Sequence, residues 1–138
     1  DKLLALRTDA QSSEAIHAAR HQLHSFYIQA YGLKDALKAD CLSLGVKPED
    51  IETAVSNDAS LALLADLANL DKHGNVLSKS PRSGFVPKIA KMSGVSDSDS
   101  GWRLSITIKH GSRSLDGLGV ARDAIDAWRR ALTALGLL

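Results

Sequence analysis

The stretch Ser12–Leu44, SSEAIHAARHQLHSFYIQAYGLKDALKADCLSL, decides the fold of this chain. It contains no proline, its one glycine is Gly32, and its apolar residues recur every three or four positions, which is the period of an α-helix. Ser12 or Ser13 can cap its N-terminus, and Gly45 can cap its C-terminus. A helix of this length extends for about 50 Å, which exceeds the width of a domain of this size. Other elements must therefore pack along it.

The chain after this helix predicts two shorter helices. Pro48 opens the first, with acidic residues beside the positive end of the helix dipole, and this helix ends near Ser56. The segment Ser56–Asp58 then caps another helix, which we expect to run from about Ala59 to His73 and to end at Gly74. A polar connection follows, over residues 75–84.

The next residues change from a helical to a strand period. Phe85–Ala90 suits an edge strand because Pro87 cannot donate to a ladder, and Ser93–Gly101 is predicted as a Ser/Asp-rich loop. Trp102–Lys109 alternates between apolar and polar residues, which is typical of a half-buried strand. A turn at residues 110–111 connects it to a short strand, Ser112–Leu115.

Asp116 caps a closing helix whose apolar stripe includes Trp128. The sequence thus predicts a mainly α fold in a single domain, residues 1–138. A helical bundle built on the long helix carries a small antiparallel β-sheet before the C-terminal helix. The helical part covers about 12–74, a basic β-hairpin part about 84–115, and the closing helix about 117–135.

Composition limits the classes of protein to which the chain can belong. Apolar residues make up 44% and charged residues 24% of the chain, as in ordinary globular domains, and no apolar run is long enough to span a membrane. The single cysteine, Cys41, cannot form an internal disulfide, which is typical of a reducing compartment. We therefore expect a cytoplasmic protein that has no membrane partner.

The net charge of +1 conceals a basic segment. Residues 1–71 contain six Lys/Arg and eleven Asp/Glu, whereas residues 72–114 contain eight Lys/Arg and two Asp/Glu. Clustered cations attract phosphate, so RNA is a candidate partner. The candidate nucleic-acid-binding residues are Lys79, Arg82, Arg103 and Lys109. The alternative is that these cations are only the solvent-exposed side of ordinary strands.

The stretch Asp66–His73, DLANLDKH, is the one most suited to chemistry. Asp66, Asn69 and His73 are three and four positions apart, so a helix would place them on one face, next to Lys72. A histidine near an acid and an amide can act as a general acid or base. The alternative is structural, because Lys-His-Gly also suits a helix C-terminus, where cations favour the negative dipole end and glycine caps the chain.

Two short stretches, Tyr31–Asp35 (YGLKD) in the long helix and Asp66–His73, resemble the HEPN superfamily, in particular its bacterial members with a helical body and a following hairpin. The likeness covers most of the chain, including the closing helix with Trp128. It implies a helical domain that dimerises, as members of the superfamily commonly do. Many members are metal-independent ribonucleases of toxin–antitoxin and phage-defence systems.

The resemblance makes His73 the catalytic histidine, surrounded by Asp66, Asn69 and Lys72 and faced by Lys34 and Asp35. The superfamily signature is an arginine separated from this histidine by four to six residues. Here those positions hold Asp66, Leu67 and Ala68. Lys72 can replace the arginine only as a point charge, because it lacks the planar fork of a guanidinium.

The long helix also carries His17, His21 and His24 on one side, at spacings of four and three. Two such histidines can bind zinc, but no cysteine or acid nearby completes a ligand set. The alternative is a polar stripe, continuing through Tyr27 and Tyr31, that faces solvent or a partner. We expect neither a metal nor another cofactor.

Two functions of different class follow from these observations. The first is an RNA-binding domain or metal-independent ribonuclease centred on His73. The second is a non-catalytic helical module that dimerises or binds a cognate protein, with the same residues acting as a helix cap. For both we expect a homodimer, because the long helix exceeds what one small domain covers.

Overall fold

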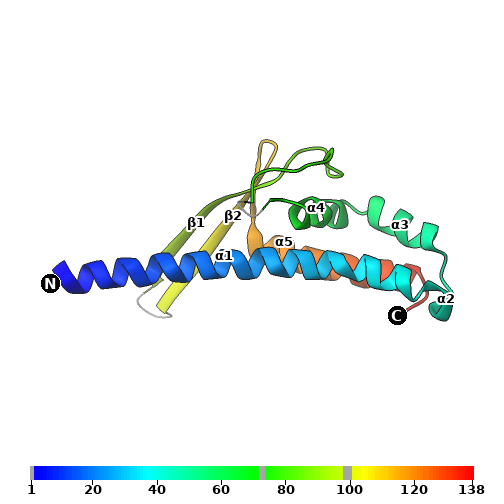
Figure 1. Ribbon diagram of the computed structural model, residues 1–138, viewed down its shortest axis with the longest axis horizontal. Coiled ribbons are helices and arrows are strands. Elements are labelled where there is room, and N and C mark those ends of the chain that lie inside the picture. The colour runs from blue at the N-terminus through cyan, green and yellow to red at the C-terminus, as the bar shows by residue number, and fades with distance from the viewer. Residues whose placement is uncertain (1, 72–73, 98–100) are drawn as a thin grey trace.

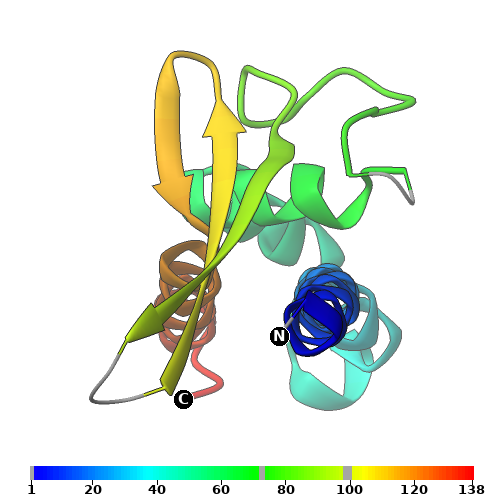
Figure 2. The ribbon, with the colours of Figure 1, turned by 90° about the vertical axis from the view of Figure 1, so that its left-hand side faces the viewer.

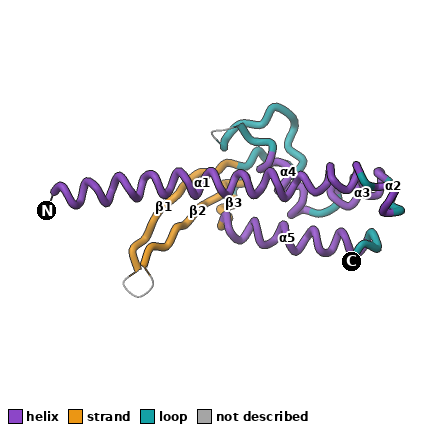
Figure 3. Tube along the Cα trace, turned by 60° about the horizontal axis from the view of Figure 1, so that its bottom comes forward, coloured by secondary structure: helices purple, strands orange, loops and turns teal. Residues whose placement is uncertain are grey.

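Helix α1 (Lys2–Ala39) runs the whole length of the computed structural model, which describes residues 2–71, 74–97 and 101–138, and the side chains of 14–71, 74–90 and 105–138 (Figure 1). Its 38 residues extend for about 57 Å at 1.5 Å per residue. The N-terminal part of α1 projects past the other helices, and its C-terminal part forms one side of a helical body (Figures 1 and 3).

After α1 the chain reverses direction, and the remaining helices pack against α1. The helices α2 (Cys41–Leu44), α3 (Pro48–Ser56) and α4 (Ala59–Ala68) follow in order, and α5 (Gly117–Ala134) ends the chain. Seen along α1, helix α5 lies beside it, and α4 bridges the two (Figure 2). Asp58 caps α4 by accepting hydrogen bonds from the backbone of the next turn, and Asp116 caps α5 in the same way, as the sequence predicts.

A three-stranded antiparallel sheet precedes α5, in the order β1 (Lys88–Asp97), β2 (Gly101–His110) and β3 (Arg113–Asp116). Ile108 pairs with Ile89 on one side and with Leu115 on the other, so one face of the sheet is apolar and packs on the helices. The mainly α fold with a small antiparallel sheet before the C-terminal helix is thus confirmed.

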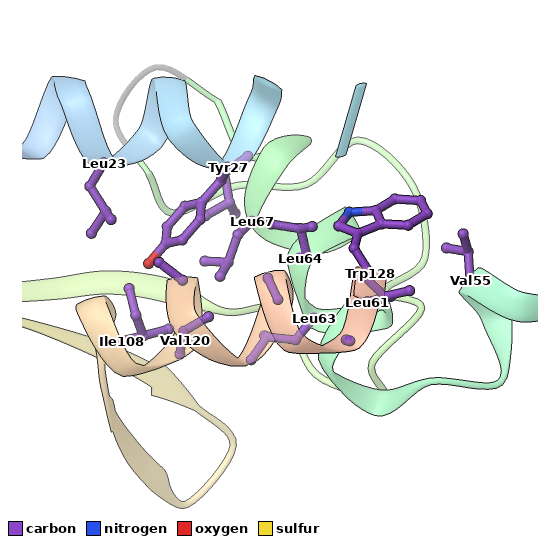
Figure 4. Packing of buried hydrophobic residues seen from close by; sticks show 14 of the residues in the cluster. Leu23, Tyr27, Val55, Leu61, Leu63, Leu64, Leu67, Ile108, Val120 and Trp128 are labelled. Carbon is purple, nitrogen blue, oxygen red and sulfur yellow. The ribbon is translucent and has the colours of Figure 1, made fainter. Parts of the chain in front are cut away.

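One hydrophobic core joins the helices to the sheet (Figure 4). Tyr27 of α1 is fully buried at its centre, and its hydroxyl donates to the carbonyl of Gly117, 2.9 Å away. Trp128 of α5 is buried as predicted, and its indole N–H donates to the carbonyl of Ala30 at 2.9 Å. The expectation that Tyr27 lies on a stripe facing solvent or a partner is therefore wrong, because the ring belongs to the core and its one polar atom is satisfied there.

Gly117 is the first residue of α5 and lies against side chains of both the sheet and α1. A Cβ atom at this position would lie 3.0 Å from side-chain atoms of both Leu23 and Ile106. These distances are tighter than ordinary van der Waals contact, so a side chain here would require Leu23 and Ile106 to shift, whereas glycine allows the close packing.

Three predicted helix boundaries are wrong. The long helix is expected to continue to Leu44, but α1 ends at Ala39, and Cys41–Leu44 forms the separate helix α2. Helix α1 begins at Lys2 and passes through Ser12 and Ser13, because a serine favours a cap without stopping a helix. Helix α4 ends at Ala68 rather than near residue 73, with Asn69 as its C-cap. The carboxylate of Asp71 accepts hydrogen bonds from the backbone N–H groups of residues 75 and 76, and these bonds favour a position for Asp71 outside the helix.

The predicted loop at Ser93–Gly101 is also wrong over most of its length. Strand β1 starts at Lys88, after Pro87, and pairs with β2 as far as Asp97 opposite Gly101. Pairing with a long partner strand overrides the local preference of Ser, Asp and Gly for loops. Residues 98–100 of the predicted loop lie outside the described residues. Within the described part of the chain, no helix is long and apolar enough to cross a membrane.

Candidate nucleic-acid interface

A groove of about 710 Å³ opens on the side of the molecule where α4, the segment before β1, the β2–β3 turn and the start of α5 meet. Its floor is apolar, formed by residues such as Leu63 and Val120. Its walls carry polar and charged side chains from α3, α4, the segment before β1, β2, β3 and α5. These are Ser56, Asn57, Ser60, Arg82, Ser83, His110, Ser112, Arg113, Asp116 and Asp123.

The buried carboxylate of Asp66 holds one wall of this groove in place. Asp66 is only 3% exposed and projects from α4 toward residues 82 and 83. It accepts hydrogen bonds from the backbone N–H of Arg82 at 2.9 Å and of Ser83 at 2.8 Å, and a third from the Ser83 hydroxyl. A buried carboxylate needs such donors, so the segment before β1 is anchored to α4.

The Ser83 hydroxyl, which is bonded to Asp66, also contacts His110. The Nε2 atom of His110 lies 2.9 Å from the Ser83 oxygen. The Ser83 hydroxyl has two acceptors, the carboxylate of Asp66 and, at 3.2 Å, the carbonyl of Phe85. Its single proton is therefore directed to an acceptor, and the oxygen of Ser83 is left to accept from His110. We therefore assign a proton to Nε2 of His110, which leaves Nδ1 as the acceptor in a neutral ring.

Alternation along β2 explains why His110 faces the groove. Ile106 and Ile108 point into the core, and His110 follows with the same parity. Arg113 pairs with His110 across the turn and lines the same groove. The ring of Phe85 packs edge-on against His110, with centroids 5.7 Å apart, and Phe85 is 58% exposed.

The predicted nucleic-acid-binding residues do not lie on one surface. Arg82 lines the groove. Lys109 has the opposite parity to His110, is exposed on the outer face of the sheet and pairs with Lys88 there. Lys79 is exposed in the connection between α4 and β1, away from the groove lining, and the side chain of Arg103 lies outside the described residues.

A second charged cluster lies next to the groove and shares Arg82 with it. The carboxylate of Glu52 on α3 lies 2.8 Å from Lys34 Nζ, 2.5 Å from Lys38 Nζ and 3.3 Å from Arg82 Nη1. Hydrogen bonds from Lys34 and Lys38 lower the pKa of Glu52 to about 2. Burial acts to lower the pKa of Lys34, but hydrogen bonds to Glu52 and Tyr31 outweigh burial, and the pKa is raised overall.

The predicted catalytic set is only partly within the described residues. Asp66 is engaged by the segment at residues 82–83, and Asn69 is the exposed C-cap of α4. Lys72 and His73 lie outside the described residues. Lys34, expected to face this set, instead pairs with Glu52.

The guanidinium group of Arg20 on α1 lies beside Gly74, directly after the stretch Asp66–His73. Arg20 Nη2 lies 2.8 Å from the position that a Cβ atom would take on Gly74, the residue directly after His73. One turn further along α1, burial lowers the pKa of His24, whereas a hydrogen bond to the carbonyl of Leu67 opposes this shift. His17 and His21 are exposed, and the described residues hold no group of three or more His, Cys, Asp or Glu that could bind a metal ion.

Sequence reasoning missed Glu52, Ser83 and His110. The parity of His110 with Ile106 and Ile108 is a signal that was present in the sequence. Lys34 and Lys38, four positions apart on α1, likewise share a face. Glu52 and Ser83 have no local signal, because their partners lie on elements far away in the chain.

No protein-family model, no curated protein and no solved structure matches the chain. The resemblance to the HEPN superfamily therefore stays a prediction from the two short stretches that carry it.

We expect Asp66→Asn to lower the free energy of unfolding by about 2–3 kcal/mol, because the new amide group would face the two backbone donors of residues 82 and 83. Urea denaturation at neutral pH measures this loss. Asp123→Asn is the matched control, since Asp123 is exposed in the same groove, and its effect should stay within about 0.5 kcal/mol. An unchanged urea midpoint for Asp66→Asn would show that this carboxylate does not anchor the groove wall.

Proposed function

We propose that the protein binds single-stranded RNA in the groove between α4, the segment before β1, the β2–β3 turn and α5. Support comes from one convergence: Arg82, His110 and Arg113, which belong to separate segments, line the same groove. The two guanidinium groups are suited to the phosphates of a nucleic-acid backbone. This proposal retains Arg82 from the predicted binding residues and adds Arg113 and His110.

The rest of the groove suits bases rather than further phosphates. Phe85 offers an exposed ring on which a base can stack. Asp123 on the α5 side carries a carboxylate that can accept from the amino groups of bases and would repel a phosphate. The backbone of the RNA would therefore follow the side of Arg82 and Arg113, with its bases turned toward α5.

Binding of a fluorescein-labelled ten-nucleotide RNA, followed by anisotropy at 50 and 150 mM salt, tests this orientation. Arg113→Ala should weaken binding about three- to tenfold at the lower salt and should make binding less dependent on salt. Lys109→Ala removes the same charge from the outer face of the sheet and should change the affinity less than twofold. Equal losses for the two variants would mean that the RNA does not use the groove.

We further propose that the bound RNA is cleaved without a metal ion, in a reaction centred on His73 with Lys72 and Asn69 nearby in the chain. Arg20 supports this finer proposal, because its guanidinium lies beside Gly74, one residue after His73. It would supply the cation that the superfamily signature places at the positions of Asp66, Leu67 and Ala68. Asp66 itself would act by holding the groove wall, through its bonds to residues 82 and 83.

An RNA degradation assay in EDTA tests this cleavage. His73→Ala should reduce the cleavage rate by at least about a hundredfold, the loss expected for a general acid or base. Arg20→Lys should reduce it as well, because a lysine keeps the charge but not the fork. His17→Ala, at an exposed position of α1, is the control that should cleave at the wild-type rate. Undiminished cleavage by His73→Ala, at an unchanged melting temperature, would remove His73 from the reaction.

A second candidate function is homodimerisation through the helices. An apolar groove of about 410 Å³ lies between α1 and α5 and is lined by residues that include Leu23, Phe26 and Ala121. Leu118 and Ile125 of α5 line it too and are 49% and 41% exposed. Exposed apolar side chains in a continuous groove favour a helix of a second copy as the occupant, in agreement with the predicted homodimer.

Light scattering coupled to size-exclusion chromatography tests this alternative. If the groove is the interface, Ile125→Glu should convert a dimer to a monomer, because it would bury an unpaired carboxylate. Ile28→Glu is the matched control, since Ile28 is 49% exposed on α1 outside the groove. A monomeric wild-type protein, or a dimer that persists in Ile125→Glu, would exclude this interface.

A further inference from the structure

Three cations converge on a single carboxylate beside the groove. Lys34 and Lys38 project from α1 and Arg82 from the segment before β1, and all three contact Glu52 of α3 at 3.3 Å or less. Three cationic side chains and one carboxylate give the cluster a formal charge of +2. The neighbouring carboxylate of Asp66 does not balance this excess through a side-chain contact, because it is engaged by Ser83 and by backbone N–H groups.

The three cations of the cluster differ in their exposure to solvent. Lys34 is 7% exposed, and its ammonium group also donates to the hydroxyl of Tyr31 at 3.2 Å and lies 5.4 Å from the centre of the Tyr31 ring. Lys38 and Arg82 have side-chain exposures of 35% and 39%, so both side chains reach solvent. The innermost cation is thus fixed, and the two outer cations are accessible to a ligand.

We propose that Lys34, Lys38 and Arg82 form a phosphate-binding site of the RNA path, and that Glu52 is an internal anion that competes with the phosphate for these cations. A phosphate group carries more oxygen atoms than a carboxylate and can accept from all three donors. Arg82 connects this site to the groove, because its side chain lines the groove and contacts Glu52. The proposal rests on the proposed function for its RNA ligand, whereas phosphate binding is testable by itself.

An ordinary stabilising ion-pair network would have different properties. In such a network, removal of the Glu52 charge would only lower stability. In a competed phosphate site, removal of the Glu52 charge frees the two outer cations, Lys38 and Arg82, for an external anion and raises the affinity for that anion. Glu52→Gln separates the two, because the amide oxygen of glutamine can still accept a hydrogen bond from Lys34 and thus preserves the innermost contact.

The first experiment measures binding of inorganic phosphate by NMR titration at low ionic strength. Glu52→Gln should bind phosphate about tenfold more tightly than the wild-type protein, an effect between the limits expected for one charge in water and in protein. Glu49→Gln makes the same change at an exposed position of α3 and should bind like the wild type. Equal phosphate affinities of Glu52→Gln and Glu49→Gln would overturn the proposal.

A further variant keeps the test valid if Glu52→Gln does not fold. Lys38→Gln preserves the pair of Lys34 with Glu52 and removes one outer cation. It should weaken the binding of both inorganic phosphate and the ten-nucleotide RNA at least threefold. Wild-type affinities for both ligands in a folded Lys38→Gln would also overturn the proposal.

The RNA assay distinguishes failure of this inference from failure of the proposed function. Glu52→Gln should bind the ten-nucleotide RNA more tightly than the wild type, with a steeper dependence on salt. RNA binding that is unchanged in Glu52→Gln would retain the groove and reject Glu52 as a competitor. Tighter phosphate binding without RNA binding by any variant would retain the phosphate site and reject RNA as its ligand.

Discussion

The buried carboxylate of Asp66 is the constraint on which the candidate site depends. A charge that is 3% exposed must be met by donors, and here the donors are two backbone N–H groups and one hydroxyl of residues 82 and 83. These bonds hold a segment that has no helix or strand of its own. They also determine where Arg82 leaves the backbone and where Ser83 can meet His110. Asp66 of helix α4 therefore positions the side chains of the candidate site.

The fold brings together charged residues that lie in different charge segments of the sequence. The sequence divides into an acidic first half and a basic middle segment. In space, Arg82 of the basic segment lies beside Lys34 and Lys38 of the acidic half, with Glu52 between them. Lys88 and Lys109, although part of the same basic segment, lie on the outer face of the sheet. The location of positive charge thus follows from the fold, and a count along the chain does not predict it.

Sequence patterns predict the elements whose signals are local. The long helix, the caps at Asp58 and Asp116 and the inward-facing Trp128 all follow from periodicity or from one residue and its next turn. The errors arise where a distant contact overrides a local preference. The backbone bonds of the Asp71 carboxylate favour a position outside α4, and β1 continues through a Ser/Asp-rich stretch because β2 pairs with it. Tyr27 is polar by composition but has a partner 90 positions away, at Gly117.

The same reason limits prediction of the site. Asp66 is correctly noticed as a residue of interest, but the sequence assigns it to a helix face with His73, whereas its partners lie 16 and 17 positions further along the chain. The sequence does not distinguish a carboxylate that acts with a nearby histidine from a carboxylate that anchors a loop. Only the position of the loop in the structure separates the two roles. Glu52 illustrates this more strongly, because it touches three cations and none is a sequence neighbour.

Helix α5 allows the two candidate functions to coexist. Gly119, Val120 and Asp123 line the polar groove, whereas Leu118, Ala121 and Ile125 line the apolar groove toward α1. At 3.6 residues per turn these sets lie on different sides of the same helix. A second copy seated between α1 and α5 would thus leave Arg82, His110 and Arg113 accessible. The proposed dimerisation and the proposed RNA binding would therefore be independent of each other, and a variant that loses one would keep the other.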